Sequence, residues 1–293
     1  MTILLIGGHG NIGKGLCMTN LGNEFVPTSR TNKAIIQLDP LDLDDLKATL
    51  DSHNYTAVVL LSACSKLDYC QQYPFESWKI NVRMPSVIAK LTNQLGYKFV
   101  SFSTEYVYDG TLNHPKTESS QNISPISRYA YQKLLCEQYV LDSNPNALVL
   151  RLPKVYNYKY KGNLLTDSIL TMNNLNSEQG LLAEDQLFTP ISCDCLASIL
   201  LKAIKKNVAG VFNCGGSEMI SRYDFVRIVA DQLSLSFGYE KGKLHEITGA
   251  NDLPCNTSMD SSALHELTGC RPISILNYVQ KHESALKCLT ATT

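Results

Sequence analysis

Short apolar runs alternate with amphipathic segments through the first half of the chain. The apolar runs cover residues 3–6, 24–28, 34–38, 57–61, 98–102 and 147–150. Between them, apolar residues recur at helical spacing over residues 12–21, 43–50, 76–95 and 127–141. Strands buried on both faces have near-continuous apolar sequences, and strands that alternate with helices form βαβ units. The pattern therefore predicts an α/β fold with a Rossmann-type, doubly wound parallel sheet.

The second half of the chain is less regular. Helical spacing recurs over residues 194–205, 221–233, 261–268 and 275–286. No comparable series of apolar runs separates these helices. We therefore predict a Rossmann domain over residues 1–155 and a smaller C-terminal α/β region over residues 156–293. The second region is expected to be partly interleaved with the first.

Composition and charge exclude several classes of protein. The chain has 293 residues, of which 44% are hydrophobic and 18% charged, so it can bury a large core. Its formal net charge is −1, without a block of like charge, which argues against a nucleic-acid partner. No apolar stretch is long enough to span a membrane, and the N-terminus lacks the pattern of a secretory signal. We therefore expect a cytoplasmic protein.

The ten cysteines do not change this expectation. Without a signal peptide, an even number of cysteines does not indicate disulfide bonds, and we expect reduced thiols. Cys193 and Cys195 are the most closely spaced pair, and no second Cys or His pair lies at zinc-binding spacing. The sequence therefore predicts no metal site.

A glycine-rich turn follows the first predicted strand. Gly7, Gly10 and Gly13 form a G-x-x-G-x-x-G pattern that opens the first predicted helix. The first two glycines allow a tight turn and a close approach to a pyrophosphate, and the third lets the helix pack on the strand. The free N–H groups of a helix N-terminus favour phosphate. The turn therefore predicts a dinucleotide site that includes Asn11 and Ile12.

The end of the second predicted strand bears on the choice of dinucleotide. An acidic residue there favours the free ribose of NAD, whereas an arginine accommodates the 2′-phosphate of NADP. This chain has Ser29 and Arg30 and no acid at that point. The sequence therefore favours NADP(H), with NAD(H) as the alternative.

Further cofactor contacts are expected after the next strands. Asp39 and Pro40 follow the third predicted strand, where adenine commonly binds. The residues after the fourth strand and one within the fifth are expected to line the cofactor. These residues are Ala63, Cys64, Ser65 and Phe102.

Tyr129 and Lys133 lie four residues apart on a predicted helix. This spacing places both side chains on one face, about 5–6 Å apart at Cβ. An ammonium at that distance is expected to lower the phenol pKa from about 10, which makes a proton donor usable near neutral pH. A second pair at this spacing, Tyr239 and Lys243, lies in a glycine-broken segment without a helical pattern. We therefore predict that Tyr129 and Lys133 are catalytic and also contact the cofactor.

Thr104 follows the fifth predicted strand. In open α/β sheets, ligands bind beyond the carboxyl ends of the strands. The Thr104 hydroxyl is therefore expected to hydrogen-bond a substrate carbonyl beside Tyr129.

Four stretches of sequence together point to a family. Residues 103–110 are Ser-Thr-Glu-Tyr-Val-Tyr-Asp-Gly, and residues 129–137 are Tyr-Ala-Tyr-Gln-Lys-Leu-Leu-Cys-Glu. Residues 150–156 are Leu-Arg-Leu-Pro-Lys-Val-Tyr, and residues 185–190 are Asp-Gln-Leu-Phe-Thr-Pro. In combination they resemble the motifs of the dTDP-4-dehydrorhamnose reductase (RmlD-type) family of extended short-chain dehydrogenases/reductases. The resemblance runs from residue 3 to about residue 275.

The resemblance implies NADPH-dependent reduction of the C4 carbonyl of a nucleotide-linked 4-keto-6-deoxysugar. Tyr129 would protonate the developing alkoxide, Thr104 would hydrogen-bond the same oxygen, and Lys133 would hold the nicotinamide ribose. Thr104, Glu105 and Pro153 would contact the substrate, and the C-terminal region over residues 156–293 would bind it. A homodimer is compatible with the family. We take five cations as candidates for binding the substrate diphosphate: Lys161, Arg222, Lys241, Lys243 and Arg271.

The chain departs from the family pattern in three places. Arg30 replaces a frequent acid, Cys64 and Ser65 replace a usual His-Thr, and Pro153 stands where an aromatic residue is frequent. These changes leave the nucleotide and the sugar open.

Other functions within the same fold also stay open. A sugar-nucleotide 4,6-dehydratase needs an Asp-Glu pair directly after the threonine, and here Tyr106 follows Glu105. A 4-epimerase typically has a Ser-Ser-x-x-Val-Tyr-Gly motif and a longer C-terminal region. The regulatory subunit of methionine adenosyltransferase is also similar, keeps the Tyr-x-x-x-Lys motif and is not an enzyme itself. Turnover would separate it from a reductase.

Overall fold

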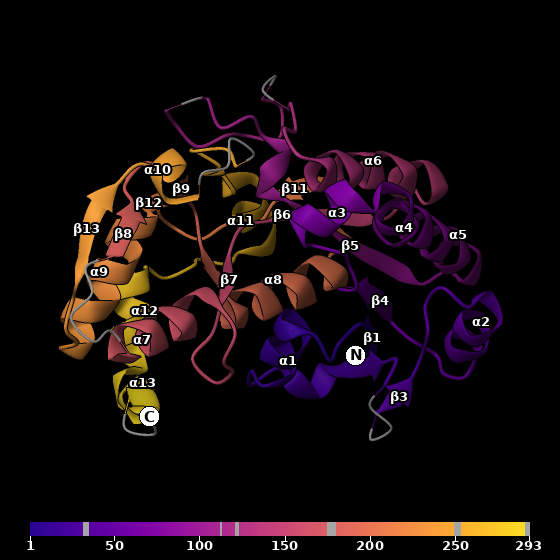
Figure 1. Ribbon diagram of the computed structural model, residues 1–293. Coiled ribbons are helices and arrows are strands. Elements are labelled where there is room, and N and C mark those ends of the chain that lie inside the picture. The colour runs from indigo at the N-terminus through magenta and orange to yellow at the C-terminus, as the bar shows by residue number, and fades with distance from the viewer. Residues whose placement is uncertain (32–34, 112, 121–122, 175–179, 249–252, 291–293) are drawn as a thin grey trace.

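The computed structural model describes residues 1–31, 35–111, 113–120, 123–174, 180–248 and 253–290 (Figure 1). Its central feature is a parallel sheet of seven strands in the order β11-β6-β5-β4-β1-β2-β3. The strands are β1 (Ile3–Ile6), β2 (Phe25–Ser29), β3 (Ile36–Gln37), β4 (Ala57–Leu60), β5 (Lys98–Thr104), β6 (Leu148–Leu152) and β11 (Gly210–Asn213). The strand order reverses at β1, as in doubly wound folds, so the predicted fold class is confirmed.

Six of the seven strands were predicted, with their ends displaced by at most two residues. β5 extends to Thr104, so this residue ends the strand instead of following it. Residue 34, where the third strand was predicted to begin, lies outside the described residues, and β3 covers only Ile36–Gln37. β11 was not predicted, because its four residues begin with glycine and lie outside the regular βαβ series. It pairs with β6.

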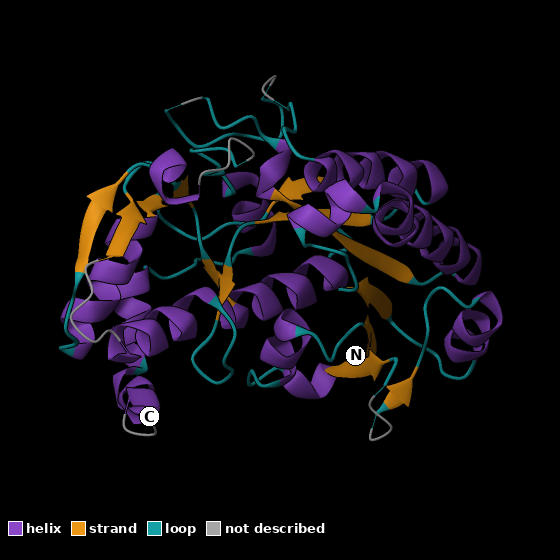
Figure 2. Ribbon diagram, viewed as in Figure 1, coloured by secondary structure: helices purple, strands orange, loops and turns teal. Residues whose placement is uncertain are grey.

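Helices cover both faces of the sheet (Figures 1 and 2). One apolar core lies between the sheet and α1 (Asn11–Cys17), α8 (Cys193–Lys205) and α11 (Ser262–Thr268). The opposite core lies beneath α2 (Leu43–Asp51), α5 (Met84–Leu95) and α6 (Arg128–Ser143). Because β1 and β4 are buried on both faces, their apolar runs are continuous. β5 and β6 are equally buried, although β5 also contains Lys98 and two serines and β6 contains Arg151.

The helix predicted over residues 76–95 forms in several segments. α3 (Leu67–Gln72) and α4 (Pro74–Trp78) lead into a π-helical turn over Lys79–Arg83, and α5 follows it directly. Two other predicted helices also differ in extent. α1 ends at Cys17, and the helix predicted over residues 275–286 divides at His282 into α12 (Ile275–Lys281) and α13 (Glu283–Thr290).

A second group of elements lies beside the sheet, at the left of Figure 1. Its helices are α7 (Leu164–Asn174), α9 (Arg222–Leu233), α10 (Leu244–Thr248), α12 and α13. Its short strand pairs are β7 (Val155–Tyr156) with β10 (Ile191–Ser192), β8 (Gly180–Ala183) with β13 (Tyr239–Gly242), and β9 (Leu187–Phe188) with β12 (Ile220–Ser221). This second group of elements has its own apolar core, in which the Tyr156 ring makes edge-to-face contacts with Phe225 and Tyr278.

The chain crosses between the two groups of elements more than once. After residue 155 it returns to the seven-stranded sheet with α8 and β11. Part of residues 156–293 thus belongs to the sheet. The division into a first domain of residues 1–155 and a partly interleaved second region of residues 156–293 stays a prediction. Within the ranges that the structure describes, no helix has both the length and the apolar composition that a membrane crossing requires.

A buried ion pair connects the end of the sheet with α6. Arg151 donates to Glu137 through Nε (2.9 Å to Oε1) and Nη2 (2.7 Å to Oε2), and both side chains are almost fully buried. Ser103 Oγ donates to the same carboxylate. The third donor, Arg151 Nη1, bonds to Tyr108 Oη at 2.8 Å, and that hydroxyl donates to Asn213 Oδ1 at 2.9 Å. The network thereby joins β5, α6, β6 and β11.

We predict that Arg151→Met lowers the free energy of unfolding by about 3–5 kcal/mol, because it leaves the Glu137 carboxylate buried without its cation. Urea unfolding at neutral pH measures the change. Arg227→Met is the matched control, since Arg227 pairs with Asp231 at the surface and should cost at most about 1 kcal/mol. Equal effects of the two substitutions would contradict the structural role given to the buried pair.

Candidate active site

Two adjoining cavities lie beyond the carboxyl ends of the parallel strands. The first, of about 390 Å³, lies between the glycine turn and the ends of β2 and β3. The second, of about 320 Å³, lies at the ends of β5 and β6, against the start of α6. Leu61 and Ala63, which follow β4, line both cavities. This edge of an open α/β sheet is where ligands bind.

The glycine turn leaves no room for side chains. Gly7 has φ +81°, and a Cβ there would lie 2.2 Å from Ser62 Oγ. A Cβ on Gly13 would lie 2.3 Å from the carbonyl oxygen of Gly8, so α1 packs on the turn because residue 13 has no side chain. Gly10 precedes α1 and provides no side-chain cap. Gly7 and Gly10 line the first cavity, whose backbone wall a dinucleotide phosphate can approach closely.

Three residues at the start of α1 that were predicted to bind the cofactor do not line the first cavity. Asn11 Nδ2 donates to the carbonyl oxygen of Gly162 at 2.7 Å, which ties α1 to the loop before α7. Ile12 lines the second cavity and not the first. Gly13 lines neither cavity, and its contribution is the close packing of α1.

The other end of the first cavity carries two charges. Ser29, Arg30, Asp39 and Pro40 all line it. Arg30 is exposed at the end of β2, and Asp39 Oδ1 accepts the Leu41 N–H at 3.1 Å. The guanidinium thus stands where a cation can meet a phosphate, and a carboxylate lies on the same wall.

The second cavity brings together the three residues predicted to be catalytic. Thr104, Tyr129 and Lys133 all line it, with Phe102 and Ser65 on its walls. Ser127 Oγ accepts the Ala130 N–H at 3.3 Å, which starts α6 at Arg128 and places Tyr129 in its first turn.

Thr104 and Lys133 complete this arrangement. Lys133, one turn after Tyr129, is only 4% exposed. Thr104 Oγ1 accepts the Tyr106 N–H at 3.3 Å, and the Thr104 side chain hydrogen-bonds Tyr129. A phenol, a hydroxyl and an ammonium therefore meet at the end of β5.

The electrostatics of Tyr129 differ from the prediction. Burial raises the pKa of its phenol above the ordinary value, and the hydrogen bond from the Thr104 side chain is the interaction that lowers it. The predicted net lowering by Lys133 is wrong for this structure, because the loss of solvent around the phenol outweighs the favourable interactions. Tyr129 is consequently neutral near pH 7, which is the form that donates a proton.

Cys64 is fixed behind the cavities and does not line either of them. Its Sγ lies 3.8 Å from Cys70 Sγ. Asn81, fully buried in the π-helical turn, accepts the Cys64 N–H at 2.8 Å and donates to its carbonyl oxygen at 2.9 Å. Asn81 also donates to Gln132 Oε1 on α6, so it fixes the loop after β4 to the catalytic helix. An asparagine within a predicted apolar helix was the available sequence signal for this role.

Glu105, predicted to contact the substrate, lines the second cavity and is 3% exposed. Burial raises the pKa of its carboxyl to about 7, although the Lys154 ammonium and a hydrogen bond from Thr257 oppose the rise. Within the described ranges, Glu105 Oε2 has no hydrogen-bond partner. Pro153 is buried and lines the same cavity.

Two residues of this cavity were missed from the sequence. Lys154 Nζ donates to Tyr106 Oη at 3.1 Å, and both side chains line the wall beside Glu105. The sequence feature that could have indicated Lys154 was a lysine in the otherwise apolar segment Leu-Pro-Lys-Val-Tyr, immediately after a buried strand. A cation at that point faces the same edge of the sheet as Thr104.

The five cations proposed for a diphosphate lie in different places. Lys241 and Lys243 approach Glu184, at 3.6 and 2.9 Å, on the surface. Lys161 is exposed in the loop before α7. Only Arg222, the first residue of α9, is held near Tyr106, with which it interacts electrostatically.

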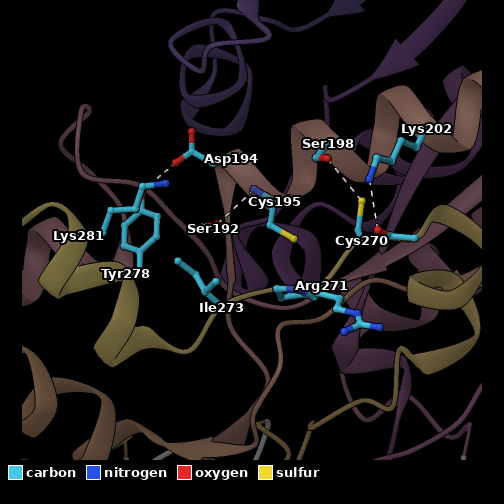
Figure 3. A pocket seen from close by; sticks show the side chains of 12 residues that line it. Ser192, Asp194, Cys195, Ser198, Lys202, Cys270, Arg271, Ile273, Tyr278 and Lys281 are labelled. Atoms are coloured by element: carbon cyan, nitrogen blue, oxygen red, sulfur yellow. Dashed lines mark hydrogen bonds between the residues drawn. The ribbon is translucent and has the colours of Figure 1, made fainter.

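Arg271 belongs to a separate pocket of about 250 Å³ between α8 and α12 (Figure 3). Asp194, Cys195 and Lys281 also line this pocket. Apart from Arg271, it contains none of the residues predicted to bind cofactor or substrate. Among the described residues, no group of three or more His, Cys, Asp or Glu side chains is arranged to hold a metal ion.

Comparison with known proteins agrees with this geometry. Residues 1–282 match the RmlD substrate binding domain family. A dTDP-4-dehydrorhamnose reductase of Sinorhizobium fredii is 28% identical over 226 residues, which are 73% of this chain and 75% of that protein. Methionine adenosyltransferase 2 subunit beta of Xenopus tropicalis is 25% identical over 248 residues, covering 82% and 73% of the two chains.

Solved structures share the fold. A dTDP-4-dehydrorhamnose reductase of Clostridium acetobutylicum superposes with a TM-score of 0.85 at 23% identity, covering 98% of this chain and all of that one. The enzyme of Bacillus anthracis, solved in complex with NADP, gives a TM-score of 0.82 at 19% identity and covers 100% and 99% of the two chains. Since the family match extends over nearly the whole sequence, the chain belongs to the RmlD substrate-binding-domain family, among the dTDP-4-dehydrorhamnose reductase-like extended short-chain dehydrogenases/reductases.

Proposed function

We propose that the protein is an NADPH-dependent reductase that acts on the C4 carbonyl of a nucleotide-linked 4-keto-6-deoxysugar. The observation that carries this proposal is the meeting of Thr104, Tyr129 and Lys133 in one cavity. That cavity adjoins the one formed by the glycine turn. A proton donor therefore lies next to a space suited to a dinucleotide.

The residues of the two cavities fit NADPH. The turn at Gly7 and Gly13 excludes side chains, as a backbone cradle for a pyrophosphate requires. Arg30 would bind the 2′-phosphate, and the walls formed by Ile12, Ala63 and Phe102 would enclose the nicotinamide end. When bound, NADPH supplies the hydride. Related folds solved with NADP and with NADPH support the same choice of cofactor.

The protein's own contribution is to place and protonate the substrate carbonyl. Tyr129 is neutral because burial raises its pKa, so it can donate its proton to the oxygen as negative charge develops there. The Thr104 hydroxyl orients the Tyr129 phenol and provides a second contact for the same oxygen. Lys133, buried beside them, would hold the ribose hydroxyls and stabilise the phenolate left behind.

A second candidate function is that of a non-catalytic, NADP-binding regulatory subunit. It is favoured by the similarity to methionine adenosyltransferase 2 subunit beta, which covers 82% of this chain. The raised pKa of Tyr129 suits an enzyme that only donates a proton, and equally a phenol without a catalytic role. Measured turnover distinguishes the two functions.

We predict that Tyr129→Phe lowers kcat by about 10²–10⁴-fold, because it removes the proton donor and leaves the cavity wall in place. The measurement is the loss of NADPH absorbance with enzymatically prepared dTDP- and UDP-4-keto-6-deoxyglucose. Tyr131→Phe is the control, since Tyr131 is 49% exposed on the same helix and should keep the wild-type rate.

Both tyrosine variants should still bind NADPH, and Tyr131→Phe should bind it with the affinity of the wild type. If the wild type binds NADPH and reduces neither keto-sugar nucleotide, the reductase proposal is wrong for these substrates. The regulatory function then becomes the better explanation.

A second prediction concerns Arg30. Arg30→Ala should weaken NADPH binding by about 10–100-fold, the effect of losing a charge-assisted bond to phosphate, and leave NADH binding unchanged. Fluorescence titration measures both affinities. Arg271→Ala, an exposed arginine in the separate pocket of Figure 3, is the control. Equal losses for NADPH and NADH would show that Arg30 does not select the 2′-phosphate.

A further inference from the structure

Two thiols lie against each other behind the wall that the two cavities share. Cys64 follows β4 and Cys70 lies within α3, and their sulfur atoms are 3.8 Å apart. Cys70 Sγ also donates to the carbonyl oxygen of Cys64 at 3.3 Å. The reaction proposed above uses neither thiol, so the pair is available for chemistry of its own.

The two thiols differ in their access to solvent. Cys64 is half-buried, whereas Cys70 is fully buried. Burial and the neighbouring Cys64 raise the pKa of the Cys70 thiol to about 11, although hydrogen bonds with Ser77 and Asn81 oppose the rise. A thiol reacts as its thiolate, so Cys70 is protected from a dissolved oxidant. Cys64 is therefore the thiol that an oxidant reaches first, and Cys70 is placed to react with Cys64.

The distance between the sulfurs suits a bond that a small movement can close. An S–S bond is about 2.05 Å long, so the two sulfurs must approach each other by roughly 1.8 Å from their separation of 3.8 Å. Cys64 lies in the loop between β4 and α3, whereas the Cys70 N–H is held in α3 by the carbonyl oxygen of Lys66 at 3.0 Å. The loop is therefore the segment that moves when the bond forms.

The loop that must move forms part of both cavities. Ala63 lines both of them, and Ser65 lines the second. In the dithiol form, the buried Asn81 side chain accepts the Cys64 N–H at 2.8 Å and donates to the Cys64 carbonyl oxygen at 2.9 Å. A disulfide draws Cys64 toward α3 and disturbs these two hydrogen bonds. The wall at Ala63 and Ser65 is then displaced, and the space for a dinucleotide changes shape.

The pair also lies close to the catalytic helix. Cys70 interacts electrostatically with Tyr129, and Figure 1 shows α3 beside α6. Asn81 Nδ2 lies 3.7 Å from Cys70 Sγ and donates to Gln132 Oε1 on α6 at 2.9 Å. One buried amide thus contacts Cys64, Cys70 and the helix that carries Tyr129. A change at the two sulfurs is therefore transmitted to the site through direct contacts.

We propose that Cys64 and Cys70 form a reversible modification site, at which a peroxide converts the two thiols into a disulfide that weakens the binding of NADPH. The choice of NADPH as the affected ligand rests on the proposed function, whereas the formation of the disulfide does not.

The oxidation balances in two steps. The Cys64 thiolate attacks one oxygen of the peroxide, so that an S–O bond forms, the O–O bond breaks and the first water leaves. The Cys70 thiolate then attacks the sulfur of the Cys64 sulfenic acid, so that the S–S bond forms, the S–O bond breaks and a second water leaves. The thiols lose two electrons and two protons, and hydrogen peroxide becomes two waters. A dithiol reductant reverses the disulfide by exchange.

The disulfide can be identified directly, because Lys66 lies between the two cysteines. Trypsin cleaves after lysine, so the reduced protein should release residues 48–66, with Cys64, and residues 67–79, with Cys70, as separate peptides. The full-length protein is treated with hydrogen peroxide, and its remaining thiols are blocked with N-ethylmaleimide before digestion. Mass spectrometry should then detect the two peptides joined, and dithiothreitol should separate them.

Fluorescence titration with NADPH measures the consequence for binding. The affinity of the wild type should fall by about tenfold or more after peroxide treatment and return after reduction. Cys64→Ser should give no joined peptides and the same affinity before and after peroxide. Cys70→Ser should also give no joined peptides, and its Cys64 should stop at the sulfenic acid, which dimedone traps. The matched control is Cys255→Ser, which removes an exposed thiol elsewhere and should respond like the wild type.

Three results would overturn the proposal. The two peptides stay separate in the wild type at a peroxide concentration that oxidises Cys255, they join without a change in the affinity for NADPH, or the response disappears in Cys255→Ser. A reduced wild type that binds no NADPH would instead contradict the proposed function. In that protein, joined peptides would still support the disulfide, and separate peptides would refute it.

Discussion

The buried pair of Glu137 and Arg151 is the interaction on which the site depends. A charge pair removed from water stabilises a structure only when its remaining donors and acceptors are also satisfied. Here Ser103 donates to the Glu137 carboxylate, and Tyr108 accepts a hydrogen bond from Arg151 and donates one to Asn213. Because Ser103 directly precedes Thr104, and Glu137 lies two turns after Tyr129 on α6, the network fixes the strand end and the helix that carry the chemistry.

The sequence predicted the sheet well for a physical reason. Strands such as Ile3–Ile6 and Ala57–Leu60 are buried on both faces, so their composition alone marks them. It did not predict β11, which begins with glycine and depends on pairing with β6. The glycine turn and the Tyr129–Lys133 pair were found because their chemistry is encoded over a few residues, and the structure places both at the edge of the sheet where the cavities lie.

The features of the site that the sequence did not predict correctly depend on contacts between segments that are distant along the chain. The pKa of Tyr129 is set by burial, which no local spacing reveals. Cys64 follows the same strand as Ala63 but is turned toward Cys70, because Asn81 fixes its backbone. Position along the chain indicated that Thr104 and Glu105 belong to the site, but it could not show which cations accompany them.

The reaction we propose is the transfer of a hydride from NADPH to the C4 carbonyl of a sugar nucleotide bound in the second cavity. The most direct measurement uses NADPH deuterated at the transferable position of its nicotinamide, with dTDP-4-keto-6-deoxyglucose as substrate and mass spectrometry and NMR of the product sugar. We predict one deuterium, bound to C4, with the wild type and a rate of labelling reduced by about 10²-fold or more with Tyr129→Phe. A wild-type protein that binds the labelled cofactor and transfers no deuterium to this sugar or its UDP counterpart would contradict the proposed hydride transfer.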